Sequence, residues 1–333
     1  MTPLFERICL EDVDRSDELF SMSFEPDLSR LRESVKRVGI LEPLWLREKG
    51  GRFQIVGGFR RFDTALSLRE ERVPALIWKG EQLEDMRAFW MSLHSNVTAR
   101  GLNPVEKGLV LGKLLDHFRL SRKEVIRTAM PLLGLEPSEK ILSGFLLLNG
   151  FPTPLKRYLL SHGASLATVS LLGRFTGEEQ ESLAGFLAPL RLGENVLREI
   201  LTFMWEISRR DGVRVDEVIS GEEMRRLLSD GRLSGPQRIE AIRRVLREKR
   251  YPRLSALEET FRSARKRMRL SPKILLKPPP FFEGNRFRIE IGFETLEEYR
   301  AALSELRDLP EESINSLLAI KGYGGDTHGT GLP

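Results

Sequence analysis

The stretch Arg52-Phe-Gln-Ile-Val-Gly-Gly-Phe-Arg-Arg61 sets the fold of the first hundred residues. Residues 52–56 predict a strand, which Gly57 and Gly58 end, and a helix then begins at Phe59. Glycines at such a turn expose backbone N–H groups, and the positive end of the helix dipole attracts anions. The turn is therefore a candidate phosphate site. A lone double glycine is more commonly a plain tight turn, followed here by two surface arginines.

Two arginines, Arg60 and Arg61, fall in the first turn of that helix. Positive charges oppose the helix dipole there, at a cost of about 0.3–1 kcal/mol each, and a bound phosphate would reverse the sign. The surrounding sequence predicts a mixture of elements. We expect helices over residues 27–38, 59–68 and 83–93, and strands over 43–47, 52–56 and 73–78.

The rest of the chain is predicted to be mainly helical. From Asn103 to about Leu246 no segment has a convincing strand pattern, and capping boxes at residues 103–106, 121–124 and 176–179 mark helix starts. After this helical segment we expect a helix over 254–270, with a capping box at 255–258, and strands at 273–276 and 286–293. A final helix is expected to start with a capping box at 295–298 and to end near 309. Residues 321–333 contain five glycines and predict a mobile tail.

The composition excludes several classes of protein. The chain has 333 residues, 41% of them hydrophobic, which fits two or three globular domains. A single cysteine, Cys9, rules out a disulfide framework, and four scattered histidines argue against a histidine-rich metal centre. No apolar run approaches the ~18 residues of a membrane helix. The start shows no signal-peptide pattern, so we expect a cytoplasmic protein, with the acidic segment from Glu6 to Glu18 as a docking segment or a solubilising leader.

Positive charge is concentrated near the C-terminal end. Residues 241–277 hold 13 basic and 3 acidic residues, although the whole chain has a net charge of only +5. Four cations form one stripe of the helix expected over 254–270: Arg262, Arg265, Lys266 and Arg269. The opposite stripe is apolar: Leu257, Phe261, Ala264 and Met268. Such a block is typical of a protein that binds a polyanion, with a solvated helix face as the alternative.

Patterns typical of enzymes are missing. Residues 108–113 resemble a Walker A loop only superficially, because the spacing is short and no Ser or Thr follows Lys113. Core packing inside a helix explains them better. The sequence contains no HExxH motif, no serine-centred elbow and no paired-carboxylate signature.

Short motifs flank the glycine turn in a distinctive order. The run Leu31-Arg-Glu-Ser-Val-Lys-Arg-Val-Gly-Ile-Leu-Glu-Pro43 and a strand ending at Arg47 precede it, and Asn96 and Leu102-Asn-Pro-Val-Glu106 follow it. Across residues 19–125 this order resembles the ParB family of partition proteins, which show an SIKxxGxxxP-like run, a GERR-type turn, an ENxxR segment and an LNPxE helix start. Residues 285–300 resemble, more weakly, the strand-then-helix dimerisation end of that family.

The resemblance implies an α+β protein. Residues 1–100 would form a ParB/sulfiredoxin-like nucleotide-binding domain, and 101–250 a helical domain with a divergent helix-turn-helix. Residues 251–318 would carry the basic helix and a small strand-helix dimerisation domain, and 319–333 a flexible tail.

The resemblance also implies CTP and Mg²⁺ as ligands of the first domain. The residues that match the family motifs are Arg47, Gly57, Gly58, Arg60, Arg61 and Asn96. Arg47, Arg60 and Arg61 would contact the triphosphate, the two glycines would cradle it, and Asn96 would support the metal. Phe59 and Ser95 replace the family's two glutamates, and Arg100 lies one position late. Without the hydrolytic carboxylate we expect at most a slow CTPase, unless a nearby acid such as Glu42 substitutes.

DNA is the expected partner. Residues 120–129 and 138–148 occupy the place of the helix-turn-helix, where Ser138, Lys140 and Ser143 are candidates for contacting bases, and a buried structural helix is an equal alternative. The basic stripe would add salt-sensitive affinity. The resemblance implies a nucleoid-associated homodimer that acts as a clamp with a partition ATPase, and no membrane partner. The alternatives are an ATP-dependent phosphotransfer enzyme on the same fold, or a degenerate relative that binds a protein.

Overall fold

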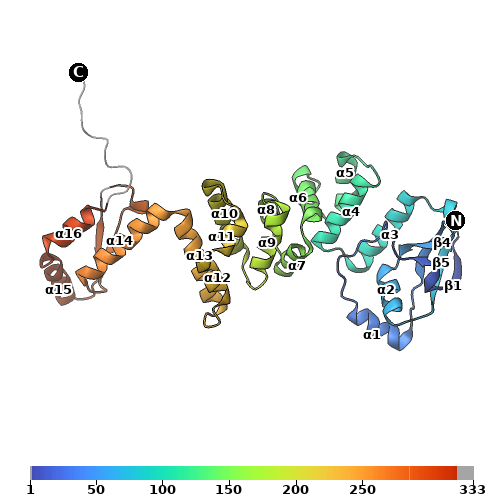
Figure 1. The fold of residues 1–333 in the computed structure, drawn as a ribbon, viewed down its shortest axis with the longest axis horizontal. Helices are drawn as coiled ribbons and strands as arrows, with labels where there is room; N and C mark the ends of the chain where they lie inside the picture. The colour runs from blue at the N-terminus through green and yellow to red at the C-terminus, as the bar shows by residue number, and fades with distance from the viewer. Residues whose placement is uncertain (1, 285, 321–333) are drawn as a thin grey trace, which may run out of the picture. The chain divides into compact units, whose positions relative to one another are not determined.

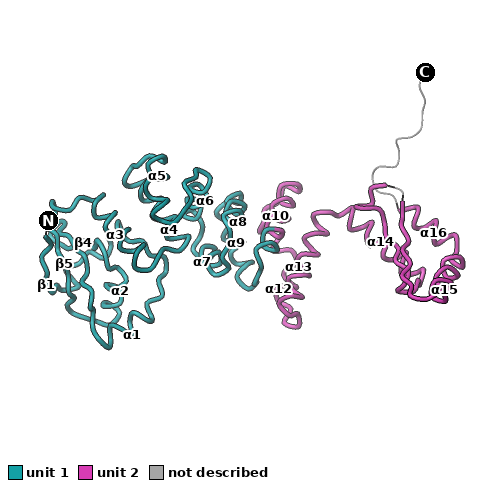
Figure 2. Tube along the Cα trace, turned by 180° about the vertical axis from the view of Figure 1, so that it is seen from behind, with its two compact units in different colours: residues 1–198 teal, residues 199–333 magenta. Residues whose placement is uncertain are grey.

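We analysed a computed structural model that describes residues 2–284 and 286–320. The chain divides into two compact units, residues 1–198 and 199–333, coloured separately in Figure 2. The domain boundaries predicted at residues 100, 250 and 318 stay a prediction. The predicted tail over 321–333 lies outside the described residues.

A five-stranded sheet forms the centre of the N-terminal part (Figure 1), in the order β1-β5-β3-β4-β2. Its strands are β1 Leu4–Cys9, β2 Val13–Asp14, β3 Leu44–Lys49, β4 Arg52–Gly57 and β5 Arg72–Trp78. Strands β3 and β4 form an antiparallel hairpin, whereas β3 and β5 are parallel. The hairpin turns at Gly50 and Gly51, whose φ angles of 59° and 77° suit glycine.

Three helices accompany this sheet: α1 Ser29–Val38, α2 Phe59–Ser67 and α3 Asp85–Arg100. Leu44, Ile55, Phe62 and Ile77 belong to one buried cluster that joins the sheet to α2. The predicted strands and the first two helices are confirmed, and α3 runs seven residues beyond its predicted end at residue 93.

The acidic segment from Glu6 to Glu18 contributes residues to two strands of the sheet that the sequence analysis did not predict. Strand β1 pairs antiparallel with β5, and β2 pairs parallel with β4. Strand β1 was not predicted because it lies at the edge of the sheet. Of its residues only Ile8 is buried, and most others, such as Glu6 and Arg7, are exposed. The apolar alternation that marks a strand is therefore weak there.

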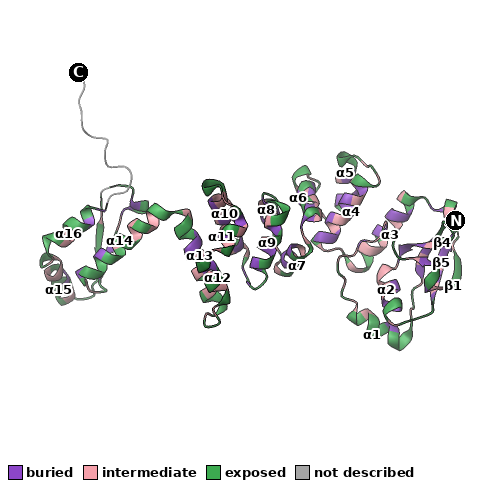
Figure 3. Ribbon diagram, in the orientation of Figure 1, coloured by how far each residue is buried: buried purple, intermediate pink, exposed green. Residues whose placement is uncertain are grey.

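A run of helices follows, as predicted, and Figure 3 shows buried residues on these helices. The helices are α4 Pro104–Asp116, α5 Arg122–Leu132, α6 Glu139–Gly150, α7 Thr153–His162, α8 Leu166–Leu172, α9 Gly177–Leu187 and α10 Glu194–Asp211. Capping boxes at Asn103, Ser121 and Thr176 begin α4, α5 and α9. The Walker-like glycines pack against α6, since a Cβ on Gly108 would lie 2.6 Å from the Phe145 carbonyl oxygen.

The C-terminal unit continues with helices and a two-stranded sheet. Its elements are α11 Val215–Ser220, α12 Glu222–Ser229, α13 Gly235–Arg250, α14 Pro252–Met268, β6 Ile274–Lys277, β7 Arg288–Ile291, α15 Leu296–Arg307 and α16 Glu311–Leu318. Short 3₁₀ turns are η1 Leu10–Asp12, η2 Gly80–Gln82 and η3 Pro280–Phe282. Within the described ranges, none of the helices has the length and apolar character needed to cross a membrane.

Two predicted boundaries in this unit were wrong. Helix α14 begins at Pro252 rather than at a Ser255 cap, because proline is well tolerated in the first turn, where its missing N–H has no partner to lose. Helix α15 is capped by Thr295 as expected, but it is followed by α16. Pro310 ends the first helix and supplies the N-cap position of the second.

Candidate functional site

The turn between β4 and α2 leaves little room for a side chain at Gly57 and requires glycine at Gly58. A Cβ on Gly57 would lie 3.1 Å from Cε3 of Trp45. Gly58 has φ of +95°, and a Cβ there would lie 2.8 Å from Cδ2 of Leu44. Gly58 is also the N-cap of α2, and no side chain caps this helix start. The first N–H groups of α2 therefore lack a side-chain acceptor, as an anion-binding helix terminus requires.

Arg60 lies beside this turn in a polar cluster. It donates to Oγ of Ser23 over 3.2 Å and pairs with Oε1 of Glu106 over 3.3 Å. Glu106 is only 1% exposed and also pairs with Arg100 over 2.7 Å. Burial, followed by the nearby charge of Arg100, lowers the pKa of Arg60. We call Ser23, Arg60, Arg100 and Glu106 the Glu106 cluster, which places two cations around one buried carboxylate.

Asn96 reaches the same cluster. Its Oδ1 accepts from Nε of Arg100 over 3.1 Å, and its Nδ2 donates to the Ser92 carbonyl oxygen. The structure thus brings together Arg60 and Asn96, which the sequence analysis selected, with Arg100 and Glu106, which it did not. In the sequence Glu106 was visible as part of a capping box and of the LNPxE-like helix start, neither of which indicates that it pairs with Arg60.

Arg47 and Arg61 make contacts within the protein. Arg47 is 6% exposed and donates to the carbonyl oxygen of Leu83 over 2.8 Å and to Asp85. Arg61 donates to the carbonyl oxygens of Glu42 and Pro43 over 2.8 and 3.0 Å, and burial lowers its pKa. Both guanidinium groups therefore hold neighbouring segments in place. Their predicted contact with a triphosphate stays a prediction.

The site fits an anion better than an isolated cation. The uncapped start of α2 and the partly exposed Arg60 offer positive potential. Over the described residues, no group of three or more His, Cys, Asp or Glu side chains is arranged to hold a metal. Mg²⁺ is bound through oxygen atoms and keeps several waters, so here it would depend on phosphate oxygens of a bound nucleotide, with Asn96 as an added ligand.

The candidate DNA-reading helix is α6. Ser138 is its N-cap, and Lys140 and Ser143 are exposed on its surface. Ser143 accepts a hydrogen bond from Arg122 of α5 over 2.8 Å. The other face of α6 is buried through residues such as Leu142 and Phe145. The helix therefore has a core face and an open face, and its contact with bases stays a prediction.

The basic stripe of α14 is only partly neutralised. Arg262 pairs with Glu259 over 2.6 Å. Arg265, Lys266 and Arg269 are exposed and form no salt bridge within the described residues. Several other cations of residues 241–277 are paired with acids: Arg243, Arg244, Arg247, Arg250, Lys273 and Lys277. The strongest unpaired positive charge of this block is thus at the C-terminal end of α14.

Comparison with known proteins agrees with the motif order. A family model of the ParB N-terminal domain matches residues 8–97. The probable chromosome-partitioning protein ParB of Coxiella burnetii is 31% identical over 125 residues, which cover 34% of this chain and 42% of that protein. The chromosome-partitioning protein ParB of Myxococcus xanthus is 28% identical over 120 residues, or 36% and 40% of the two chains. This chain therefore spans less than half the length of these relatives.

Solved structures give a weaker likeness. A C-terminally truncated chromosome-partitioning protein ParB from Caulobacter crescentus, complexed with CTP-gamma-S, is 22% identical with a TM-score of 0.26, covering 55% of this chain and 97% of that one. The same protein complexed to the centromeric parS site is 21% identical with a TM-score of 0.31, covering 64% and 95%. Scores this low support no argument about geometry. The predicted α+β fold with a ParB-type N-terminal domain and a helical middle is confirmed.

Proposed function

We propose that the chain is a ParB-family protein, and specifically a CTP-gated, DNA-binding partition or regulatory protein that works as a dimeric clamp. The observation that carries the proposal is the start of α2. Two glycines, the second with a left-handed backbone, lead into an uncapped helix terminus, and Arg60 lies beside it within the domain matched by the family model. An anion such as a triphosphate would be stabilised there by backbone N–H groups and by the helix dipole.

Nucleotide binding would change the surroundings of Arg60. In the structure its charge is balanced by Glu106, which Arg100 also neutralises. A phosphate at the start of α2 would offer Arg60 a second anion, and Arg100 would keep Glu106 paired. Because Glu106 lies in the first turn of α4, this exchange would link the nucleotide to the helical region that follows. Mg²⁺ bound with the nucleotide would neutralise part of its phosphate charge.

Calorimetric titration with CTP and with ATP, each with Mg²⁺, tests this site. We expect saturable binding that favours CTP, lost in Arg60→Ala. The control is Arg87→Ala, which removes an exposed arginine from α3 and leaves the turn intact. A preference for ATP would point to phosphotransfer chemistry. Unchanged CTP affinity in Arg60→Ala, or no heat with either nucleotide, would refute the site.

We infer that hydrolysis, if it occurs, is slow. Ser95 on α3 has no carboxylate to orient water. Glu42 pairs with Arg61, and Glu106 is held between two arginines, so neither is placed as an unengaged base. We expect phosphate release from CTP to be near background, and Ser95→Glu to raise it. Rapid turnover by the unmodified chain would contradict this inference.

DNA binding would rest on the basic stripe of α14. Its unpaired cations Arg265, Lys266 and Arg269 can neutralise phosphates without reading bases. We expect duplex affinity to fall as salt rises, and Arg269→Ala to reduce the slope of log K against log [salt] by about 1. The candidates on α6 would add sequence preference, which Lys140→Ala would reduce. A slope unchanged by loss of all three cations would refute the role of α14.

An exposed apolar face supports a homodimer. Leu296, Tyr299 and Leu303 follow one side of α15, and exposed Phe293 packs against Tyr299. Leu296 is 55% exposed, and such clusters are commonly covered by a partner. We expect Leu296→Asp to shift the protein from dimer to monomer in analytical ultracentrifugation, whereas Leu41→Asp, at an exposed position in the other unit, leaves the dimer intact. A partition ATPase is a further proposed partner.

A further inference from the structure

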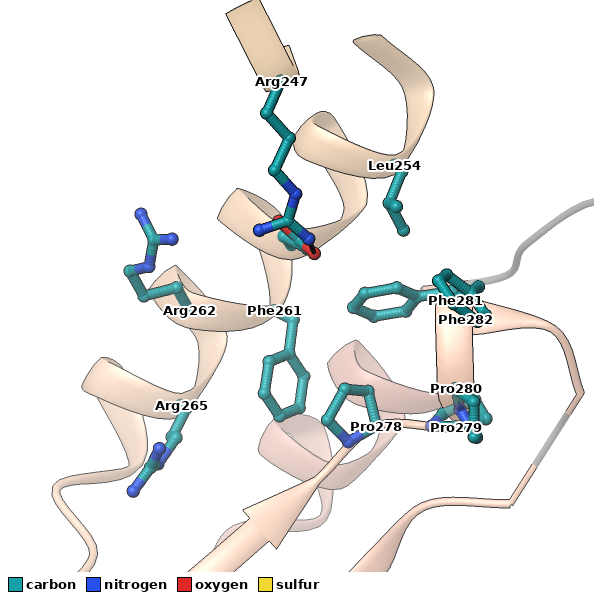
Figure 4. A pocket seen from close by; sticks show the side chains of 11 residues that line it. Arg247, Leu254, Phe261, Arg262, Arg265, Pro278, Pro279, Pro280, Phe281 and Phe282 are labelled. Carbon is teal, nitrogen blue, oxygen red and sulfur yellow. Dashed lines mark hydrogen bonds and ion pairs between the residues drawn. The ribbon is translucent and has the colours of Figure 1, made fainter. Parts of the chain in front are cut away.

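A cavity of about 410 Å³ lies in the C-terminal unit, between α14 and the segment that follows β6. Leu254 and Phe261 of α14 line one side, and Phe281 and Phe282 of η3 line the other. Figure 4 shows the ring of Phe261 directed toward Pro278 and the two phenylalanines of η3 on the far side of the opening. The volume is in the range of cavities that hold small ligands or a few side chains.

The wall formed by η3 has an unusual backbone. Phe281 and Phe282 have φ angles of +53° and +58°, a left-handed conformation that is costly for residues with a Cβ. Phe282 is buried, and its packing with Leu317 and Ile320 offsets that cost. Phe281 is 74% exposed and gains no comparable packing. A strained backbone that holds a large apolar ring in water is typical of a site that binds something.

The charges at the opening limit what that ligand can be. Arg247 is paired with Glu258 over 2.8 Å, and Arg262 with Glu259 over 2.6 Å. Arg265 lines the cavity and forms no salt bridge within the described residues. One unpaired cation beside an apolar cavity matches an apolar group with a neighbouring carboxylate. It matches a polyphosphate chain poorly, because such a chain needs several cations.

The proline wall adds apolar surface. Pro278, Pro279 and Pro280 line the cavity and have no N–H groups. The carbonyl oxygens of Pro279 and Pro280 accept hydrogen bonds from the backbone N–H groups of Phe282 and Glu283 over 2.9 Å, so this wall suits an apolar side chain better than a polar one.

We propose that this cavity binds an acidic peptide segment of a partner protein. An aromatic or bulky aliphatic side chain of the peptide fills the space between Leu254 and Phe281, and a flanking carboxylate pairs with Arg265. This inference does not depend on the nucleotide site, but it shares Arg265 with the basic stripe proposed to bind DNA, so a bound peptide and bound DNA would compete for that side chain.

Fluorescence anisotropy with a labelled peptide tests the proposal on the whole 333-residue chain. The probe is Ser-Glu-Glu-Trp-Glu-Ser, with two comparison peptides. Replacing Trp by Ala keeps the charge and should weaken binding about tenfold. Replacing the three Glu by Gln keeps the anchor and should weaken it about fivefold.

Matched protein variants locate the site. Phe281→Ala should weaken the Trp peptide about tenfold, because it removes one wall at an exposed position and leaves the fold intact. Arg265→Glu should weaken it about fivefold, whereas Arg267→Glu, on the same helix but outside the cavity lining, should change it less than about twofold. Circular dichroism of each variant confirms folding.

Several results would overturn the proposal. Equal losses of peptide affinity in Arg265→Glu and Arg267→Glu would mean that the peptide is held by general electrostatic attraction and not at this cavity. Equal affinity for the Trp and Ala peptides, or no binding to either, would exclude an apolar anchor. Binding of oligodeoxythymidine that Phe281→Ala abolishes, without peptide binding, would assign the cavity to nucleic acid. Peptide binding only after removal of residues 321–333 would assign it to the chain's own end.

Discussion

Removing the charge of Glu106 should destabilise the N-terminal unit strongly. Its carboxylate is 1% exposed and lies between Arg60 and Arg100, whose side chains are 32% and 21% exposed. It also accepts from the backbone N–H of Phe24 over 3.2 Å and of Asn103 over 3.1 Å. Glu106→Gln keeps the shape and leaves two largely buried cations without a counter-charge.

The magnitude follows from this burial. Breaking a fully buried pair costs about 3–5 kcal/mol, and partial exposure of both arginines places Glu106→Gln near the lower end, at about 2–3 kcal/mol. For a unit of this size that corresponds to a fall in Tm of about 4–12 °C. Urea denaturation followed by circular dichroism measures it. The control is Glu124→Gln, since Glu124 holds the same capping-box position at the exposed start of α5.

A second measurement, with nucleotide added, distinguishes the structural role of Glu106 from its link to ligand binding. CTP or pyrophosphate should restore more stability to Glu106→Gln than to the unmodified chain, because a phosphate would supply the anion that Arg60 lacks. A loss below about 0.5 kcal/mol for Glu106→Gln, equal to that of Glu124→Gln, would refute the view that this cluster depends on the buried charge.

Three further outcomes are expected from substitutions elsewhere. Gly108→Ala should cost about 1–3 kcal/mol, because its Cβ would lie 2.6 Å from the backbone carbonyl oxygen of Phe145. Gly185→Ala, with open space in α9, should instead stabilise by about 0.5–1 kcal/mol, and thermal melts distinguish the two. Gly58→Ala should destabilise and abolish nucleotide binding together, as melts and calorimetry would show. Burial lowers the pKa of Lys113 from 10.5 to about 8, so the folded chain releases this proton first and stability should rise from about pH 8 to pH 10.5. Urea titrations across that range should show the rise flattened in Lys113→Met, and an equal slope in both proteins would contradict it.

The sequence predicted most of the fold where local signals and packing agree. Strand β4, its glycine turn and α2 follow from residues 52–67 alone, and the capping boxes at Asn103, Ser121 and Thr176 mark true helix starts. Edge strand β1 was missed because its exposed positions carry no apolar period.

The candidate site was harder to predict because its partners are far apart in the chain. Arg47 and Arg60 both looked like phosphate contacts, yet only tertiary packing shows that Arg47 is buried against Leu83 and Asp85. Glu106 lies 46 residues from Arg60, and nothing in a capping box indicates that its carboxylate also balances a distant arginine. Sequence patterns report the local role of a residue, and charge balance in a folded site is not local.

The hydrogen bond between Asn96 and Arg100 bears on how distant relatives are found. On a helix, a residue three positions on lies about 60° to one side of the starting residue, and one four positions on lies about 40° to the other. An arginine at either of these two positions can therefore reach the same asparagine, and Arg100, four residues after Asn96, does so over 3.1 Å. A sequence-pattern search that requires arginine three residues after the asparagine would miss this chain. A search that scores angular position around the helix axis would retain it.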